Sequence, residues 1–237
     1  MTVAVDAPVR MFLARHAESV LNALGRVQGW ADSPLTDRGR REAERLGHDL
    51  RGASLVAVHC ADMLRHRQTA EGALAAAAPE LTPVSDPRLR ELAFGRFEGA
   101  DDATLWGAIA ADHGHADAAA LRADPEFDVL TALASIRRLG AGSGLPSEHP
   151  SAVRARMLDV LDSIAREAGA RGGGNVLVVS SGLSIMLALD AMGVAPAALG
   201  GGIRNASFSV LGWRSGAWTV ERAAGSRSIP RRADVGT

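Results

Sequence analysis

The chain has 237 residues, of which 47% are hydrophobic and 22% charged, so it can form one large α/β domain with a full core. Its 26 basic and 27 acidic residues leave a net charge of −1, which gives no electrostatic reason to expect nucleic acid or a membrane as a partner. The one cysteine, Cys60, excludes an intrachain disulfide and a cysteine-based zinc site. The N-terminus lacks the basic and apolar regions of a signal peptide, so we expect a cytoplasmic protein.

The first part of the chain alternates short apolar runs with amphipathic stretches. Ala43, Leu46 and Leu50 recur at helical spacing, which is typical of a helix with one buried face. Apolar runs of four residues are typical of buried strands. The predicted elements are, in order, a strand at 11–14, a helix at 38–50, a strand at 55–58 and a helix at 63–78.

The remainder adds a further strand and helix at 176–179 and 185–192, and a hairpin formed by 208–213 and 217–220. Strands that alternate with helices predict a mainly parallel sheet with helices on both faces, a three-layer α/β sandwich, here ending in an antiparallel edge strand. The segment 100–150 lacks strand character and is expected to form a small helical cap. We therefore predict a single domain over 1–225 and a disordered tail over 226–237.

Polar residues follow each of the three expected parallel strands. Arg15 and His16 follow the first, Arg65 lies shortly after the second, and Ser181 follows the third. Ligands of open α/β sheets usually bind beyond the carboxyl ends of the strands. Arginines and helix N-termini that meet there would bind an anion such as phosphate. The alternative for a single Arg-His pair is that it caps a helix or pairs with surface carboxylates.

Four blocks of the sequence resemble the histidine phosphatase superfamily, which includes the cofactor-dependent phosphoglycerate mutases. The blocks are RHAESVLNALGRVQGWADSPLTDRGRREA, LRHRQTAEGA with Arg65, RLRELAFGRFEG with Glu91, and, more loosely, LPSEHPSAVRARM with Glu148 and Arg156. The residues of the first block that match the family signature in type and spacing are Arg15, His16, Ser19, Asn22, Gln28, Gly29, Asp32, Pro34, Leu35, Thr36 and Gly39.

The resemblance implies a phosphatase that acts on a small phosphorylated substrate and needs neither a metal nor a cofactor. His16 would attack phosphorus and form a phosphohistidine, Arg15 and Arg65 would hold the phosphoryl oxygens, and Glu91 would serve as general acid and base. Alternatively, Glu91 could simply pair with a neighbouring arginine, Arg88, Arg90 or Arg96. The residues expected to contact the substrate are Ser19, Asn22, Gln28, Gly29, Ser181 and Gly182.

A fifth block departs from the family pattern. Where the family reads Ser-His-Gly after a strand, this chain reads Ser180-Ser181-Gly182, so Ser181 replaces the second histidine of the catalytic pair. A serine hydroxyl donates one hydrogen bond and carries no charge. Losing one pre-organised donor costs about 10²–10³ in rate. Four histidines could substitute, although each is more simply a surface histidine: His66, His113, His115 and His149.

Other functions stay open at this stage. A mutase needs a closed, strongly cationic pocket, and the cap segment has few basic residues. A phosphate-binding protein without turnover, or a biosynthetic enzyme with a repurposed site, would also fit Ser181. Four apolar cap residues could receive an apolar leaving group, although cap core is the simpler interpretation: Trp106, Phe127, Leu130 and Leu133. An edge strand could also pair with a second copy to give a homodimer.

Overall fold

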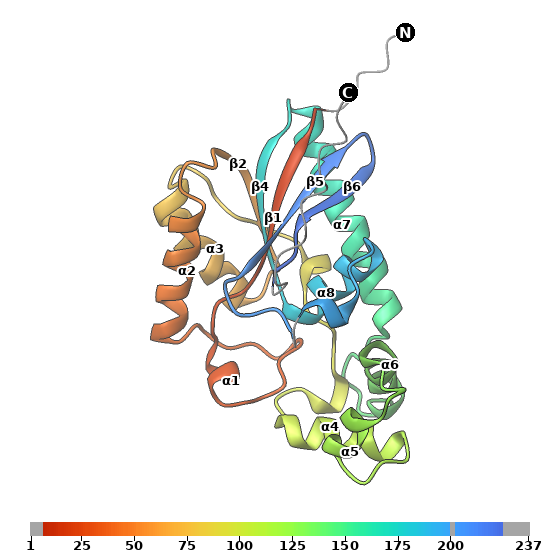
Figure 1. The fold of residues 1–237 in the computed structure, drawn as a ribbon. Coiled ribbons are helices and arrows are strands. Elements are labelled where there is room, and N and C mark those ends of the chain that lie inside the picture. The colour runs from red at the N-terminus through yellow and green to blue at the C-terminus, as the bar shows by residue number, and fades with distance from the viewer. Residues whose placement is uncertain (1–6, 200–201, 225–237) are drawn as a thin grey trace.

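The computed structural model describes residues 7–199 and 202–224. Its centre is a six-stranded sheet in the order β3-β2-β4-β1-β5-β6 (Figure 1). β1, β2, β3 and β4 run parallel, and β5 and β6 are antiparallel to their neighbours. The strands are β1 (Val9–Arg15), β2 (Leu55–Cys60), β3 (Val84–Ser85), β4 (Gly174–Ser180), β5 (Phe208–Arg214) and β6 (Ala217–Arg222).

Helices cover both faces of the sheet, with α2 and α3 on one side and α7 and α8 on the other (Figure 1). The helices are α1 (Val20–Ala23), α2 (Asp37–Asp49), α3 (Leu64–Ala77), α4 (Asp102–Asp112), α5 (Ala118–Ala123), α6 (Val129–Leu139), α7 (Pro150–Ala170) and α8 (Gly182–Ala191). Three short 3₁₀ turns lie at Pro87–Leu89, Gly95–Phe97 and Pro196–Leu199. This mixed sheet between helical layers confirms the predicted fold class.

The alternation of side chains along β1 explains the two layers. Phe12 and Ala14 belong to the core cluster that includes Leu46 of α2. Met11 and Leu13 point the other way and pack into the larger cluster on the side of α7 and α8. Both sides of β1 are therefore buried, as expected for a strand of a parallel sheet that is covered on each face.

The sequence did not predict the 21-residue helix α7, which is the longest in the described chain. Pro150 occupies its first turn, and the His149 ring caps the helix by accepting from the Ser151 amide. A proline at the first helical position and a capping side chain before it are typical start signals. Within the described residues, no helix is both long and apolar enough to cross a membrane.

Helices α4, α5 and α6 gather beyond the carboxyl ends of the parallel strands (Figure 1). They occupy the segment that the sequence predicted as a cap. Residues Trp106, Phe127, Leu130 and Leu133 all belong to or pack against the larger core cluster. The cap helices are thus joined to the core of the domain, while the predicted disordered tail over 226–237 lies outside the described residues.

Candidate functional site

Strand register brings His16 and Ser181 together at the carboxyl edge of the sheet. Arg15 of β1 lies opposite Ser180 of β4, so the next residue of each strand leaves the sheet at the same point. The His16 amide donates to the Ser180 carbonyl at 2.9 Å, which holds the two chain segments together there.

The His16 side chain is buried, and its hydrogen bond fixes the tautomer. Nδ1 lies 2.9 Å from the Ala17 carbonyl oxygen. A carbonyl oxygen can only accept, so Nδ1 carries the proton and Nε2 keeps its lone pair. Burial, reinforced by Arg65 and Arg15, lowers the pKa of His16 well below its ordinary value. The imidazole is therefore neutral and has one nitrogen available as a nucleophile.

Arg65 lies in the first turn of α3 with its side chain 0% exposed. Its Nη2 donates to the Gly29 carbonyl at 2.7 Å, and its Nη1 donates to the Ala31 carbonyl at 3.0 Å. Nη1 also lies 3.2 Å from Oδ1 of Asp32. The second oxygen of that carboxylate accepts from the Leu64 amide at the start of α3. The loop before α2 thus clamps both the guanidinium and the helix that carries it.

Arg15 approaches from the other side of the site. Its Nη1 donates to the Ile203 carbonyl at 2.7 Å, and its guanidinium packs on Gly182, where a Cβ would lie 3.5 Å from Nε. Burial lowers the pKa of Arg15, whereas the nearby carboxylates of Glu91 and Glu42 raise it. The first residue of α8, Gly182, therefore packs directly against the guanidinium of Arg15.

Buried nitrogens without partners gather around His16. In the described part of the chain, five buried side-chain nitrogens lack a hydrogen-bond partner, and three belong to this site: Arg15 Nε, Arg65 Nε and His66 Nδ1. An unpartnered buried donor is costly unless a ligand satisfies it. Two arginine donors and an imidazole that lie around one histidine fit an anion such as a phosphoryl group.

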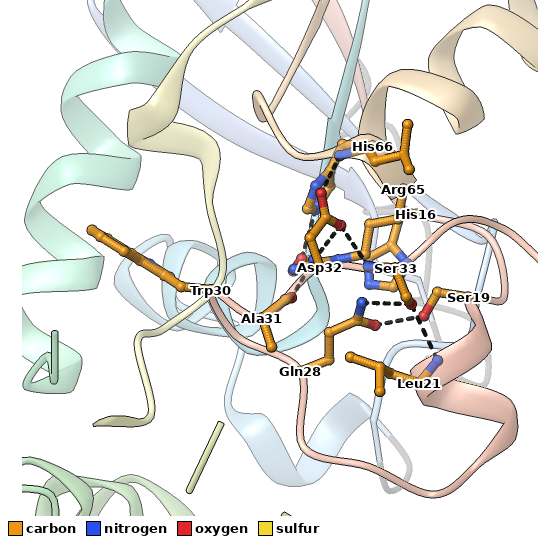
Figure 2. A network of polar contacts seen from close by, with 12 residues as sticks. His16, Ser19, Leu21, Gln28, Trp30, Ala31, Asp32, Ser33, Arg65 and His66 are labelled. Atoms are coloured by element: carbon orange, nitrogen blue, oxygen red, sulfur yellow. Dashed lines mark hydrogen bonds and ion pairs between the residues drawn. The ribbon is translucent and has the colours of Figure 1, made fainter. Parts of the chain in front are cut away.

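A polar network ties the loop after His16 to the loop that holds Arg65 (Figure 2). Ser19 Oγ donates to Gln28 Oε1, and Gln28 Nε2 donates to Ser33 Oγ at 3.1 Å. Asn22 also contacts Gln28, at 3.5 Å. Ser19 is fully buried and caps α1, so it acts within the network and not at the cavity surface.

Gly29 is held against the carboxylate of Glu98. A Cβ at this position would lie 2.2 Å from the Leu92 carbonyl and 2.5 Å from Glu98 Oε1, so only glycine fits. The Glu98 carboxylate accepts from the amides of Gly29, Trp30, Ala31 and Phe94. Gly29 therefore shapes the clamp around Arg65 and does not itself line the cavity.

Glu91 does not pair with a neighbouring arginine. Arg88 and Arg90 pair instead with Asp86 and Asp62, respectively, while the Arg96 guanidinium lies over the Phe97 ring. The Glu91 carboxylate instead accepts from the first turn of α8.

In that turn, Oε2 accepts from the Leu183 amide and Oε1 from the Ser184 amide, both at 2.9 Å. Ser184 Oγ and the Leu92 amide also donate to Oε1. Glu91 thus supplies the negative charge favoured at a helix N-terminus, and Oε2, with one donor, keeps room to bind a proton.

The fourth sequence block supports the segment that carries Glu91. Arg156 donates to the carbonyls of Arg88, Arg90 and Glu91, and it pairs with Glu148 at 2.8 Å. Glu148 in turn accepts from the Ala93 amide. These two residues hold the backbone on each side of Glu91, and neither lines the cavity that contains His16.

A cavity of about 380 Å³ opens between the carboxyl edge of the sheet and the cap. Predicted site residues in its lining are Arg15, His16, Asn22, Gln28 and Glu91. Arg65, Ser19, Gly29, Ser181 and Gly182 lie behind them and do not line it. The opposite wall is mostly apolar and includes Phe94, Leu105, Trp106, Leu133 and Leu183.

Sequence reasoning missed two residues of the site. Asn205 lines the cavity, and its Nδ2 donates to the His16 carbonyl at 3.0 Å and to Asn22 Oδ1 at 3.1 Å. No motif marked it, because it follows a loop far along the chain.

The other is His66, for which the expectation of a surface histidine is wrong, because its side chain is 0% exposed. Its Nε2 lies 2.7 Å from Ser181 Oγ. The position directly after Arg65 could have signalled this burial. His113 is exposed, whereas His115 and His149 are half-buried. Among residues 7–199 and 202–224, no three His, Cys, Asp or Glu side chains group as a metal site.

Comparison with known proteins places this geometry in context. A model of the histidine phosphatase superfamily (branch 1) matches residues 11–225. A probable phosphoglycerate mutase of Yersinia pestis (strain Pestoides F) is 41% identical over 90 residues, which are 38% of this chain and 41% of that protein. The match thus spans less than half the length of that curated relative.

Two solved structures are similar over nearly the whole chain. The phosphoglycerate mutase from Bacillus anthracis str. Sterne has 30% identity and a TM-score of 0.84, and the match covers 92% of this chain and 93% of that one. The Bacillus stearothermophilus protein YhfR has 27% identity and a TM-score of 0.71, with 93% and 98% covered.

Proposed function

The chain belongs to the histidine phosphatase superfamily (branch 1), and from that premise we propose that it hydrolyses a small phosphomonoester, without a metal ion, through a phosphohistidine on His16. The neutral, tautomerically fixed imidazole of His16 supports the nucleophilic role. Arg15 lines the cavity and Arg65 lies behind it, and both would hold the phosphoryl oxygens through Nε–H donors that have no partner in the described residues. These fixed cations stabilise the charge that develops in transfer.

The proposed reaction has two steps. In the first, His16 Nε2 forms a bond to phosphorus while the ester P–O bond breaks, and Glu91 gives its proton to the leaving oxygen. In the second, Glu91 takes a proton from water, whose oxygen attacks phosphorus and breaks the N–P bond. Glu91 suits both roles because it lines the same cavity as His16 and keeps an oxygen with a single donor.

One observation carries the choice of hydrolysis: away from the reacting groups, the cavity wall is mostly apolar. Among the described lining residues, Arg26 is the one cation besides Arg15, and it lies 3.9 Å from Asp101 and lines the cavity with Asp102. Two of the cap arginines have partners, since Arg138 pairs with Asp112 and Arg122 lies over the Trp106 ring. A mutase must hold a second anionic group of its intermediate, and this wall offers little charge for it.

Phosphoglycerate mutase activity is the second candidate, because two of the similar proteins are named as mutases. Ser181 motivates a third, a phosphate-binding protein or a repurposed biosynthetic enzyme with little turnover. The family resemblance predicts a histidine at that position, and the serine there would lower or alter the activity unless another group compensates.

The test is rapid-quench kinetics with a panel of phosphomonoesters, including 3-phosphoglycerate, that follows released phosphate and phosphate bound to protein. We expect release from at least one ester and acid-labile phosphate on His16, both abolished in His16→Ala. Isomerisation of phosphoglycerate without phosphate release would favour the mutase. Tight phosphate binding with no phosphohistidine and no release would contradict both enzymes.

A further inference from the structure

His66 is a second imidazole buried in the candidate site. It follows Arg65 directly in the first turn of α3 and is 0% exposed. Its ring centroid lies 5.1 Å from that of His16, and the two rings meet edge to face at 76°. Burial and the neighbouring arginines both disfavour the charged form of an imidazole. A histidine enclosed here is therefore a neutral group beside the candidate nucleophile.

Ser181 is turned toward this imidazole. It is the N-cap residue of α8, where a serine hydroxyl normally accepts from the helix amides, yet its side chain makes no capping bond. The Glu91 carboxylate binds the Leu183 and Ser184 amides instead. Ser181 Oγ lies 2.7 Å from His66 Nε2. The serine therefore gives up a capping contact and orients the ring.

The other ring nitrogen of His66 is unsatisfied. Nδ1 is buried and has no hydrogen-bond partner among the described residues, like Arg15 Nε and Arg65 Nε in the same site. Burial, then Arg65, His16 and Arg15, lowers the pKa of His66, so the free imidazole is neutral. When Ser181 donates to Nε2, the proton lies on Nδ1, which is then a buried donor that lacks an acceptor.

We propose that His66 is a further catalytic residue, whose Nδ1–H hydrogen-bonds the phosphoryl group during its transfer to and from His16, and that Ser181 is its positioning residue. The inference rests on the proposed function. His66 forms and breaks no covalent bond in either step. It supplies the imidazole donor that the family resemblance places at position 181, but from the first turn of α3. The serine and this histidine thus form one unit in place of a single side chain.

The decisive experiment exchanges the two positions. The variants are His66→Ala, Ser181→His and the double variant His66→Ala/Ser181→His, with His113→Ala in the cap as the matched control. Rapid-quench kinetics with para-nitrophenyl phosphate measure the rate of His16 phosphorylation, kcat and KM. We expect His66→Ala to slow phosphorylation about 10²–10³-fold with a KM change of a few fold at most. The phosphorylation rate of the double variant should recover at least ten-fold relative to His66→Ala, because alanine at position 66 leaves space for an imidazole at position 181.

Rescue by the exchange separates catalysis from a packing role. Wild-type phosphorylation rates in His66→Ala would overturn the inference, as would a loss of rate that the double variant does not restore. If His66→Ala fails to fold, His66→Leu fills the space without a hydrogen-bond donor, and its phosphorylation rate decides in the same way. The melting temperature of each variant shows whether it is folded.

A binding measurement keeps this inference distinct from the proposed function. Imidazole ¹⁵N spectra are recorded with and without vanadate, which imitates the transferring phosphoryl group. We expect the His66 Nδ1–H signal to shift when vanadate binds, and His66→Ala to weaken vanadate binding at least ten-fold. A shift without turnover of any ester would contradict the phosphatase and retain His66 as an anion ligand. Turnover with no shift would retain the phosphatase and contradict the role of His66.

Discussion

The cavity has two walls that are built in different ways. At the sheet edge, His16 and Glu91 line the cavity and Arg65 lies behind them, and all three are buried and held by backbone groups from several segments of the chain. In the cap, polar contacts are more exposed: the Arg138 side chain that pairs with Asp112 is 66% exposed. A reacting group must be fixed within a fraction of an ångström, whereas a surface that receives a leaving group can vary. Under the proposed function, the sheet edge would therefore carry the reaction and the cap would select what reacts.

The largest of the four effects is expected at Glu91. Glu91→Gln removes the proton donor but keeps an oxygen that can accept from the first turn of α8. We expect kcat/KM, which reports the first step, to fall about 10²–10⁴-fold for alkyl phosphates, whose leaving oxygen needs a proton. The fall should be smaller for para-nitrophenyl phosphate, whose leaving group departs as an anion. Steady-state kinetics with both esters measure this difference, and equal losses for the two would argue against general acid catalysis by Glu91.

Arg65→Lys tests whether the fixed geometry of this wall matters beyond its charge. A lysine keeps the charge but cannot contact the Gly29 and Ala31 carbonyls and still present a second donor to the phosphoryl group. We expect kcat/KM to fall about 10²–10³-fold. Arg67→Lys is the matched control, because Arg67 is exposed in the same turn of α3. Equal activity of the two variants would mean that the fixed guanidinium geometry of Arg65 does not matter for the reaction, so the sheet-edge wall would not differ from the cap wall in this respect.

The residues at the sheet edge were more predictable than helix α7 for a physical reason. Arg15, His16 and Arg65 sit where strand ends meet, and parallel strands necessarily bring their carboxyl ends to one edge. Helix α7 was missed because a single burial stripe over 150–170 does not stand out from its alanine- and arginine-rich context.

His66 was misjudged because its contact with Ser181 spans 115 positions of sequence. Asn205 likewise gave no local signal. Long-range side-chain contacts of this kind follow from the fold, and no periodicity within one segment reveals them.

Buried histidines at the sheet edge should also make folding sensitive to acid. Burial lowers the pKa of His16 and His66, and of His59 in β2, relative to their ordinary values. As pH falls below about 6.5, the unfolded chain binds protons that the folded chain does not, so the free energy of unfolding decreases. Each such histidine contributes up to about 1.4 kcal/mol per pH unit in that window.

Urea denaturation between about pH 5 and about pH 8 measures this slope. His66→Gln should reduce the change of the free energy of unfolding with pH. Its effect on stability should be smallest at the acid end, where the wild-type chain has already lost stability through protonation of the unfolded state. A variant with the wild-type slope would mean that His66 binds protons equally well in the folded and unfolded chain, contrary to its burial beside two arginines.

The smallest effect is expected on the cap wall, at Trp106. Its half-buried ring lines the cavity, with the Arg122 guanidinium 4.9 Å from the ring centroid. Trp106→Ala removes apolar surface from the leaving-group side, worth about 1 kcal/mol, or about five-fold in KM for phenyl phosphate. The kcat should stay near that of wild type, because no reacting group is touched. Trp218→Ala removes a half-buried tryptophan of β6 that binds Asp162 away from the cavity, and it should leave KM unchanged.

The pattern of these two constants decides what the cap does. A higher KM for phenyl phosphate together with an unchanged KM for a small alkyl phosphate would place leaving-group selection on the apolar wall. A fall in kcat for both esters would mean that Trp106 helps to fix His16 or Glu91. The two walls would then not divide reaction from selection, and the cap would have to be counted among the parts that hold the reacting groups.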